Sequence, residues 1–280
     1  MAKLVVDAHQ HFWELGRFQY PWLTRDLGVL YRNYLPRDLK SVLGELGIDR
    51  TILVQATHSE DETEWLLDLA DQNDFVGGVV GWVDLTSPRL SLSLEHFTSR
   101  PKLVGLRHQA HDDPDASWLV REDVLAGLGM LSQTGLAYDL LVRTPHLPCV
   151  SVIAERYPDL RLVVDHIAKP PIAHRASQEW AKAMEPLGRY RNVFCKLSGM
   201  ITEADWSNWK PSDLRLYVDH VMDVFGPDRL MFGSDWPVCL LAGSYLDVWN
   251  VIHELVDTAT AEAKDKIFGG TAVSFYQLES

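Results

Sequence analysis

The sequence predicts a single α/β domain folded as a (β/α)8 barrel, and three observations lead to this fold class. The chain has 280 residues, a length at which α/β barrels form one domain. Short β-branched apolar runs alternate with segments of helical period, at roughly 35 residues per strand and helix. No stretch rich in proline, glycine or serine divides the chain. We therefore expect residues 1–280 to form one barrel domain.

The predicted strands are mostly continuous apolar runs, the pattern of strands that are covered on both faces in a parallel sheet. A doubly wound open sheet is the competing architecture, but no GxGxxG or GxxxxGK[ST] motif follows the first strand. A closed barrel is therefore favoured. In chain order the eight predicted strands are Leu4–His9, Thr51–Gln55, Val76–Val83, Leu103–His108, Leu136–Val142, Leu160–His166, Val193–Leu197 and Leu230–Gly233.

The helices between the strands are predicted from start and stop signals. The helix that follows Leu35 ends at Gly47, where a left-handed residue is favoured. Ser59 and Glu62 fit a capping box, with Ser59 as the N-cap and Glu62 at the third helical position. Pro186 interrupts a further helical pattern. The remaining predicted helices are Asp123–Thr134, Pro148–Arg156, Trp180–Leu187 and Ser212–Phe225.

Composition and charge exclude several classes of partner. The chain has 26 Lys+Arg against 39 Asp+Glu, a formal net charge of −13, which argues against nucleic acid and against an anionic membrane surface. It contains no uninterrupted apolar run long enough to span a membrane, and Asp7 breaks the first apolar run too early for a signal peptide. Three scattered cysteines, without a CxxC pair, favour free thiols over a disulfide framework. We expect a cytoplasmic protein of undetermined oligomeric state.

Long irregular segments follow three of the predicted strands, at Phe12–Asn33, His108–Ser117 and Ser198–Pro211. In an α/β barrel, the loops at the carboxyl ends of the strands build the active site. We therefore expect the functional residues at this end of the barrel.

The first predicted strand ends in the triplet His9-Gln10-His11. Residues two apart in a strand point to the same face, so both imidazoles are expected at the mouth of the barrel. Two imidazoles at this spacing can bind one metal ion or donate together to a substrate carbonyl.

The sixth and eighth predicted strands carry further candidates. If Leu162 and Val164 face the barrel core, His166 shares their face and Asp165 points outward. Asp235 follows the eighth strand at the same level, where a carboxylate can bind a metal, take a proton from water, or cap the next helix. Three histidines and one aspartate from three strand ends together indicate a site.

These motifs resemble the amidohydrolase superfamily. The closer resemblance is to its lactonase branch, which includes sugar-acid lactonases and 2-pyrone-4,6-dicarboxylate lactonase, and within it to L-fucono-lactonase and L-rhamnono-lactonase members. The matching segments are His9-Gln10-His11, Tyr20-Pro21-Trp22, Gly105-Leu106-Arg107-His108-Gln109, Asp165-His166 with Lys169-Pro170, Cys195-Lys196-Leu197-Ser198-Gly199, Thr202-Glu203-Ala204-Asp205-Trp206 and Phe232-Gly233-Ser234-Asp235-Trp236-Pro237-Val238-Cys239.

The resemblance implies a TIM-barrel hydrolase that opens a sugar-derived lactone to its aldonic acid, a reaction of carbohydrate catabolism. Asp235 matches the aspartate that activates the hydrolytic water. His9, His11 and His166 match the histidines that polarise the lactone carbonyl or hold a metal. The expected partner is a small sugar lactone of the L-fucono or L-rhamnono type.

The fifth predicted strand departs from the superfamily pattern, and this departure argues against a site with two metal ions. Members with two metals use a carboxylated lysine or a histidine on strand five, and Leu136–Val142 contains neither residue type. The lactonase branch hydrolyses lactones without an obligatory divalent ion, although one zinc ion at His9, His11 and Asp235 is geometrically reasonable. The alternatives are a mononuclear zinc-dependent amidohydrolase or decarboxylase acting on a small cyclic or carboxylated substrate, and a non-enzymatic barrel that binds sugar acids.

Five other residues are candidates for substrate binding. Trp22 and Trp236 lie near strand ends, where they either stack on a sugar ring or pack in the core. Arg107, His108 and Gln109 follow one another, and the strand period lets either Arg107 and Gln109, or His108 alone, face inward.

One charged residue stands within an otherwise apolar strand. Lys196 in the seventh strand is expected to pair with a carboxylate of the barrel, and Asp139 in the fifth strand is a candidate partner.

Overall fold

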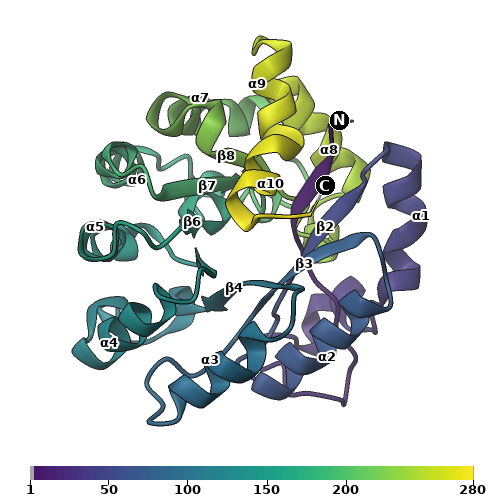
Figure 1. Cartoon of the computed structure of the whole chain (residues 1–280). Helices are drawn as coiled ribbons and strands as arrows, with labels where there is room; N and C mark the ends of the chain where they lie inside the picture. The colour runs from purple at the N-terminus through teal and green to yellow at the C-terminus, as the bar shows by residue number, and fades with distance from the viewer. Residues whose placement is uncertain (1–2, 280) are drawn as a thin grey trace.

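The computed structural model describes residues 3–279 and contains an eight-stranded parallel sheet whose strands follow one another in chain order (Figure 1). A bridge between Gln10 and Trp236 brings the last strand beside the first and closes the barrel. All eight predicted strands are present, so the predicted fold class is confirmed. The strands are β1 (Val6–Gln10), β2 (Arg50–Val54), β3 (Val76–Gly81), β4 (Leu103–His108), β5 (Ala137–Leu140), β6 (Leu162–Val164), β7 (Val193–Leu197) and β8 (Leu230–Phe232).

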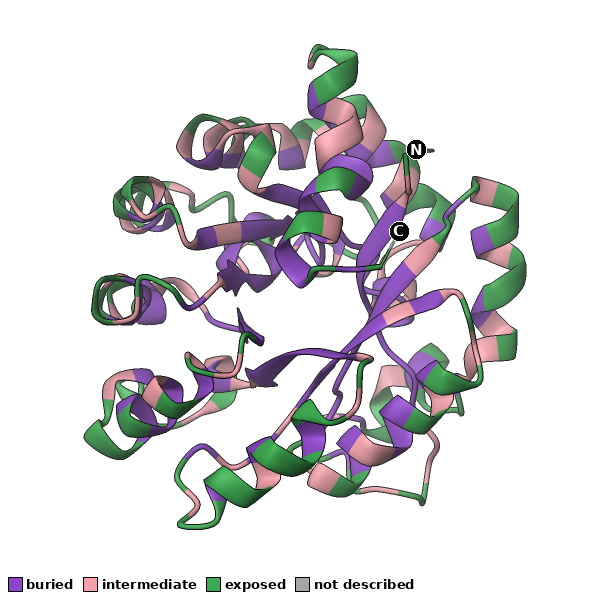
Figure 2. Ribbon diagram, viewed as in Figure 1, coloured by how far each residue is buried: buried purple, intermediate pink, exposed green. Residues whose placement is uncertain are grey.

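The helices surround the strands, and their outward faces carry the exposed residues while the strands are buried (Figure 2). Within residues 3–279 none of the helices is long and apolar enough to cross a membrane. They are α1 (Pro36–Leu46), α2 (Glu60–Asp71), α3 (Leu90–Thr98), α4 (Glu122–Leu131), α5 (Leu147–Arg156), α6 (Gln178–Met184), α7 (Pro211–Phe225), α8 (Tyr245–Leu255), α9 (Ala261–Asp265) and α10 (Thr271–Tyr276).

Three helix signals in the sequence can be compared with the structure. Gly47 ends α1 with a φ of 68°, as predicted. The helix that contains Pro186 changes to a 3-10 turn at Glu185, so α6 ends earlier than the predicted helix. Ser59 caps α2 by accepting a hydrogen bond from the Glu62 N–H at 3.2 Å, but the carboxylate of Glu62 does not return to Ser59. The predicted capping box is therefore only half formed.

The apolar core has two layers. The outer layer lies between the strands and the helices, and the smaller inner layer fills the barrel. Phe275 and Tyr276 of α10 belong to the inner layer together with residues near the starts of the strands. The carboxyl-terminal helix therefore covers the amino-terminal end of the barrel, and the opposite end is left for the site.

The side chains of β6 that point into the barrel differ from those predicted. Val163 belongs to the inner layer, whereas Leu162 and Val164 pack against the helices. Asp165 therefore points into the barrel, and the prediction that it points outward is wrong. Both faces of a parallel barrel strand are apolar and buried, so the residue pattern of such a strand does not reveal which face is the inner one.

Candidate active site

The histidines and the aspartate singled out in the sequence converge at the carboxyl ends of β1, β6 and β8. Asp235 Oδ1 lies 3.5 Å from His11 Nε2. The same oxygen lies 3.8 Å from His9 Nε2 and 3.8 Å from His166 Nε2. All four side chains are buried. One carboxylate is thus surrounded by three imidazoles.

A bulge in β1 aims His9 at this centre. Asp7 pairs with Thr51 and Gln10 pairs with Leu53, so β1 contains one more residue than β2 between these two pairs. Such a bulge places two successive side chains on the same face, and here they are Ala8 and His9. His9 therefore faces the barrel interior, and the strand alternation then brings His11 to the same face.

His166 reaches the centre through a left-handed turn rather than through strand alternation. Residues 166–169 have φ values of 54°, 47°, 62° and 47°, a conformation that costs roughly 1–2 kcal/mol per non-glycine residue. The His166 ring lies against Gly199, where an added Cβ would come within 2.6 Å of His166 Nδ1. The same nitrogen is 2.8 Å from the Ser198 hydroxyl. The strained turn is thus held by close packing against the loop after β7.

Asp235 also has a left-handed backbone, with a φ of 55°, and is fixed by contacts between β8 and β1. Its N–H donates to the His9 carbonyl at 2.8 Å. The neighbouring Ser234 donates its N–H and its hydroxyl to the Asp7 carboxylate at 2.8 and 2.6 Å. The Tyr245 hydroxyl of α8 donates to the same carboxylate at 2.7 Å. These bonds position the carboxylate of Asp235 beside the histidines.

A buried charge network lies beneath His9. Lys196 Nζ is 2.5 Å from Asp139 Oδ2, 3.0 Å from Asp165 Oδ1 and 3.1 Å from His9 Nδ1, which confirms the predicted pairing of Lys196 with Asp139. Tyr276 donates its hydroxyl to Asp139 at 2.8 Å. Burial raises the pKa of Asp139 to about 6. Burial also acts to raise the pKa of Asp165, but Lys196 and His9 hold that pKa well below its usual value.

Arg107 joins this network to the cavity above it. Its Nη1 lies 2.9 Å from Asp165 Oδ2 and 3.2 Å from His9 Nε2, while Nη2 donates to the carbonyl and side-chain oxygens of Gln55 at 2.6 and 2.9 Å. Asp165 therefore forms ion pairs with two cations, Arg107 and Lys196. Sequence reasoning missed its role because its facing was assigned wrongly.

The ambiguity at residues 107–109 is resolved. Arg107 and Gln109 line a small cavity above the histidines. The His108 ring instead lies outside it, stacked between Trp118 at 3.6 Å and His58 at 4.1 Å between ring centroids. The structure thus takes the alternative in which Arg107 and Gln109 face inward.

The inner cavity, as we call this small space, has a volume of about 150 Å³. His111, Asp112 and Lys169 also line this cavity, and no pattern in the sequence marks them as site residues because they lie in loops whose path a residue pattern does not fix. Burial and the positive charges of Lys169 and Arg143 lower the pKa of His111 to about 2. The lining residues are His11, Trp22, Ala56, Arg107, Gln109, His111, Asp112, Leu141, His166, Lys169, Asp235 and Val238.

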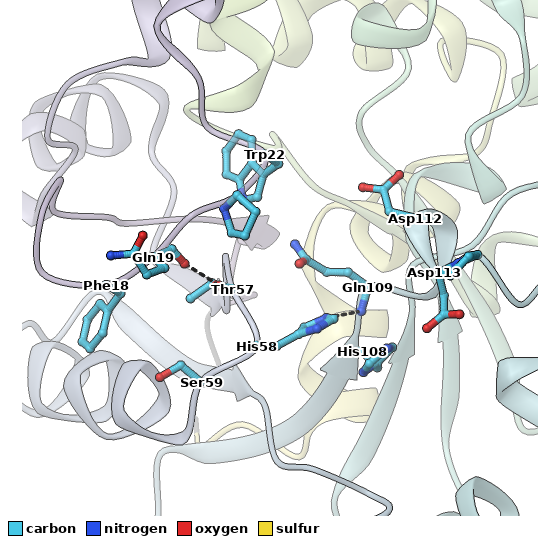
Figure 3. A pocket seen from close by; sticks show the side chains of 12 residues that line it. Phe18, Gln19, Trp22, Thr57, His58, Ser59, His108, Gln109, Asp112 and Asp113 are labelled. Atoms are coloured by element: carbon cyan, nitrogen blue, oxygen red, sulfur yellow. Dashed lines mark hydrogen bonds between the residues drawn. The ribbon is translucent and has the colours of Figure 1, made fainter.

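A second, larger space, the outer cavity, has a volume of about 780 Å³ and shares Trp22, Gln109 and Asp112 with the inner one. Figure 3 shows Trp22 above Gln109, with His58 and His108 below them and Asp112 and Asp113 to the right. The lining residues are Phe18, Gln19, Pro21, Trp22, Thr57, His58, Ser59, His108, Gln109, Asp112, Asp113 and Pro114.

The two predicted tryptophans have different surroundings. Trp22 lines both cavities, and its indole N–H donates to the Ala56 carbonyl at 2.7 Å. Trp236 is buried, with its ring packed edge-on against Phe12 and Tyr34, and it is not among the described residues that line either cavity. Its placement corresponds to the core-packing alternative.

His9 and His166 are neutral and Asp235 is ionised near neutral pH. Burial is the main cause that lowers the pKa of His9 and of His166 well below the usual value. Burial acts to raise the pKa of Asp235, but His166 and His11 outweigh it and the pKa is lowered. An ionised carboxylate beside the uncharged rings of His9 and His166 can accept a proton from water.

The same residues fit a metal ion. The three candidate ligand atoms lie 3.1 to 3.8 Å from one another; they are His9 Nε2, His11 Nε2 and Asp235 Oδ1. The distance expected between two ligand atoms of one tetrahedral zinc ion is about 3.3 Å. His11 Nδ1 is 2.7 Å from the Val54 carbonyl, so this nitrogen carries the proton and Nε2 is free for a ligand.

Comparisons with known proteins cover the whole barrel. The sequence profile of the amidohydrolase family matches residues 6–278. An L-fucono-1,5-lactonase of Burkholderia ambifaria is 39% identical over 280 residues, which span 98% of this chain and 96% of that protein. A crystal structure of an amidohydrolase from Burkholderia multivorans with bound zinc is 39% identical, with a TM-score of 0.93 and coverage of 99% of this chain and 100% of that one.

A more distant structure shows how widely this fold is used. A 2,6-dihydroxybenzoate decarboxylase from Rhizobium has a TM-score of 0.71 over 99% of both chains at 13% identity. This likeness shows the fold alone, and the barrel therefore does not decide between hydrolysis and decarboxylation.

Proposed function

The chain belongs to the amidohydrolase family, and we propose that it is a lactonase that opens a neutral sugar lactone of the L-fucono or L-rhamnono type to its aldonic acid. The observation that carries the proposal is the ionised Asp235 among three imidazoles at the floor of a cavity of about 150 Å³. Full-length similarity to L-fucono-1,5-lactonases of two Burkholderia species supports the choice of lactone.

Asp235 acts as the general base in the proposed reaction. A water molecule held against its carboxylate attacks the lactone carbonyl, and Asp235 takes the proton. General-base catalysis of this kind contributes about 10²- to 10⁴-fold to the rate. Collapse of the tetrahedral intermediate breaks the bond between the carbonyl carbon and the ring oxygen. The proton held by Asp235 then passes to that oxygen, so the base is regenerated.

The surrounding side chains stabilise the negative charge that develops on the carbonyl oxygen. Arg107 and His166 line the cavity, and the guanidinium and the Nε2 of the imidazole can donate to that oxygen. His11 Nε2 is an acceptor because Nδ1 faces the Val54 carbonyl. His9 lies beneath, where Lys196 and Asp165 fix its ring. Arg107 and His166 thus act as donors. His11 acts as an acceptor, and His9 supports the site from beneath.

Zinc bound by His9, His11 and Asp235 would polarise the carbonyl or lower the pKa of the attacking water. We propose that the reaction does not require it. Arg107 Nη1 and Lys196 Nζ lie 3.2 and 3.1 Å from the two nitrogens of the His9 ring. These two positive charges supply part of the electrostatic field that a metal would add and also weaken its binding.

A panel of aldonolactones tests the proposal. Acid release is followed with a pH indicator, and the spontaneous hydrolysis of each lactone is subtracted. We expect L-fucono-1,5-lactone or L-rhamnono-lactone to give the highest kcat/KM. The His9–His11–Asp235 set also favours a second candidate, a mononuclear zinc-dependent decarboxylase. Absence of lactone hydrolysis, together with zinc-dependent release of carbon dioxide from a small aromatic acid, would select that candidate instead.

A further inference from the structure

Glu62 is a fully buried acid to which the proposed reaction assigns no role. It lies in the first turn of α2, where the sequence predicts that it caps the helix. A buried carboxylate is rare unless it is paired, because removing its charge from water is costly. Its Oε1 has no hydrogen-bond partner among the residues that the structure describes. Such a costly placement calls for a structural or functional reason.

The other oxygen of Glu62 holds the turn that follows β2. Oε2 accepts from the Ala56 N–H at 3.0 Å and from the Thr57 N–H at 3.1 Å. We call residues Gln55–Thr57 the β2 turn. Glu62 is not among the described residues that line either cavity, so its carboxylate fixes the path of the turn without contacting the substrate space.

The β2 turn also positions residues in the walls of both cavities. The Ala56 carbonyl accepts from Trp22 Nε1 at 2.7 Å and from Gln109 Nε2 at 3.4 Å. The Thr57 hydroxyl donates to the Gln19 carbonyl at 2.7 Å, a bond drawn in Figure 3. Residues from the first loop and from the loop after β4 are therefore fixed by the same two positions.

The first residue of the β2 turn, Gln55, holds Arg107, which lines the inner cavity. The carbonyl and the side-chain oxygen of Gln55 both accept from Arg107 Nη2. A shift of the turn would therefore move Arg107 and, on the other side, Trp22, two residues that line the inner cavity.

We infer that Glu62 is a positioning residue, which fixes the β2 turn and through it the side chains that receive and orient the lactone. This inference rests on the proposed function, because lactone turnover is one of its readouts. Glu62 would act only through the turn and not through contact with the reacting atoms.

The first test compares Glu62→Ala with Glu62→Gln in the full chain, and Asp61→Asn, at the exposed neighbouring position of α2, is the control. The amide oxygen of glutamine still accepts both N–H groups, whereas alanine leaves them without an acceptor. We expect Glu62→Ala to lower kcat/KM about 10²-fold at pH 8, the effect of a roughly 1 Å misplacement. Glutamine should restore most of this loss, and unchanged kcat/KM in Glu62→Ala would overturn the inference.

Hydrogen exchange at the Ala56 and Thr57 amides provides a readout without turnover. Both amides should exchange faster in Glu62→Ala than in the wild type, and at the wild-type rate in Asp61→Asn. If the wild type hydrolyses no lactone, the proposed function fails while this measurement still tests Glu62. Equal protection of the two amides in Glu62→Ala and the wild type would overturn the role of Glu62.

If Glu62→Ala does not fold, the pH profile of Glu62→Gln decides. Burial raises the pKa of Glu62 to about 7, and the other titratable or charged side chains that face it are Tyr20 of the first loop and Arg107 of β4. The ionised carboxylate accepts stronger hydrogen bonds than the neutral acid. Wild-type kcat/KM should therefore rise through an ionisation near pH 7 that Glu62→Gln lacks. The same ionisation in both proteins would overturn the inference.

Discussion

At the floor of the inner cavity, charged groups lie in buried pairs and triplets, whereas the wall of the outer cavity consists mostly of aromatic rings and neutral polar groups, with Asp112 and Asp113 as its acidic residues. Lys196 contacts two aspartates and His9 at the floor. In the wall, burial lowers the pKa of His58, and it lowers that of His108 to about 3, so both rings are uncharged. Within residues 3–279 no lysine or arginine lines the outer cavity.

This difference separates chemistry from recognition. The floor residues project from strand ends and are fixed by several bonds each, which suits groups that must act on one atom. Most of the wall residues come from loops and offer flat rings and amides, which suit a neutral sugar ring. Substitutions in the floor should therefore change kcat, and substitutions in the wall should mainly change KM.

The largest effect is expected for Asp235→Asn, which keeps the size of the side chain but removes the base. Turnover should fall by about 10²- to 10⁴-fold, because general-base catalysis of this order is lost. KM should change little. Circular dichroism and thermal melting check that the barrel is intact, and turnover within tenfold of the wild type would show that another group is the base.

His9→Asn and His11→Asn should each lower turnover by about 10²-fold, because both rings lie against Asp235 and misplacement of a catalytic group by roughly 1 Å has this effect. His9→Asn should also lower the melting temperature more, since Lys196 and Asp165 lose a buried partner. Steady-state kinetics and calorimetry measure the two effects, and His174→Asn on the exposed surface is the control. Wild-type turnover in both variants would refute the placement of the site at β1.

Gly199→Ala should lower turnover about 10²-fold by displacing the His166 ring, because misplacement by roughly 1 Å has this effect. The matched control is Gly135→Ala, which has a φ of 79° against 61° at Gly199 but has no atom near the added Cβ. Both variants should lose stability, since alanine is strained at positive φ. Equal turnover in the two variants would show that contact with His166 is unimportant.

Trp22→Ala should raise KM by about tenfold and change kcat less, since aromatic contacts are worth about 0.5–1.5 kcal/mol beyond their burial. Trp22→Phe keeps a ring but loses the bond to the Ala56 carbonyl, so its effect should be smaller. Trp206→Ala, at an exposed tryptophan outside both cavities, is the control. A change in kcat without a change in KM would show that Trp22 contributes to the chemical step, like the floor residues, rather than to substrate binding.

The sequence was sufficient for the elements that depend on local pattern. The continuous apolar runs predicted every strand, and the spacing of His9 and His11 predicted that they converge. The left-handed turn that brings in His166 is not visible in the sequence, although His166 itself was selected. Asp165 was misassigned because both faces of β6 are apolar.

Residues whose role depends on loop paths could not be predicted. Glu62 matched a capping motif, and only the fold shows that its carboxylate binds the β2 turn instead. His111 and Lys169 line the inner cavity because the loops after β4 and β6 fold over it. For Trp236 the sequence left stacking and core packing open, and the contacts with Phe12 and Tyr34 correspond to packing.

The central claim is that Asp235 among three imidazoles hydrolyses a sugar lactone without an obligatory metal. The most direct measurement is the turnover of L-fucono-1,5-lactone by metal-stripped enzyme, before and after zinc is added, with Asp235→Asn as the reference for lost base catalysis. We predict that the stripped wild type keeps most of its turnover, and that added zinc changes it little. Almost no turnover before zinc, followed by a many-fold gain, would contradict the claim and make the bound metal the catalyst.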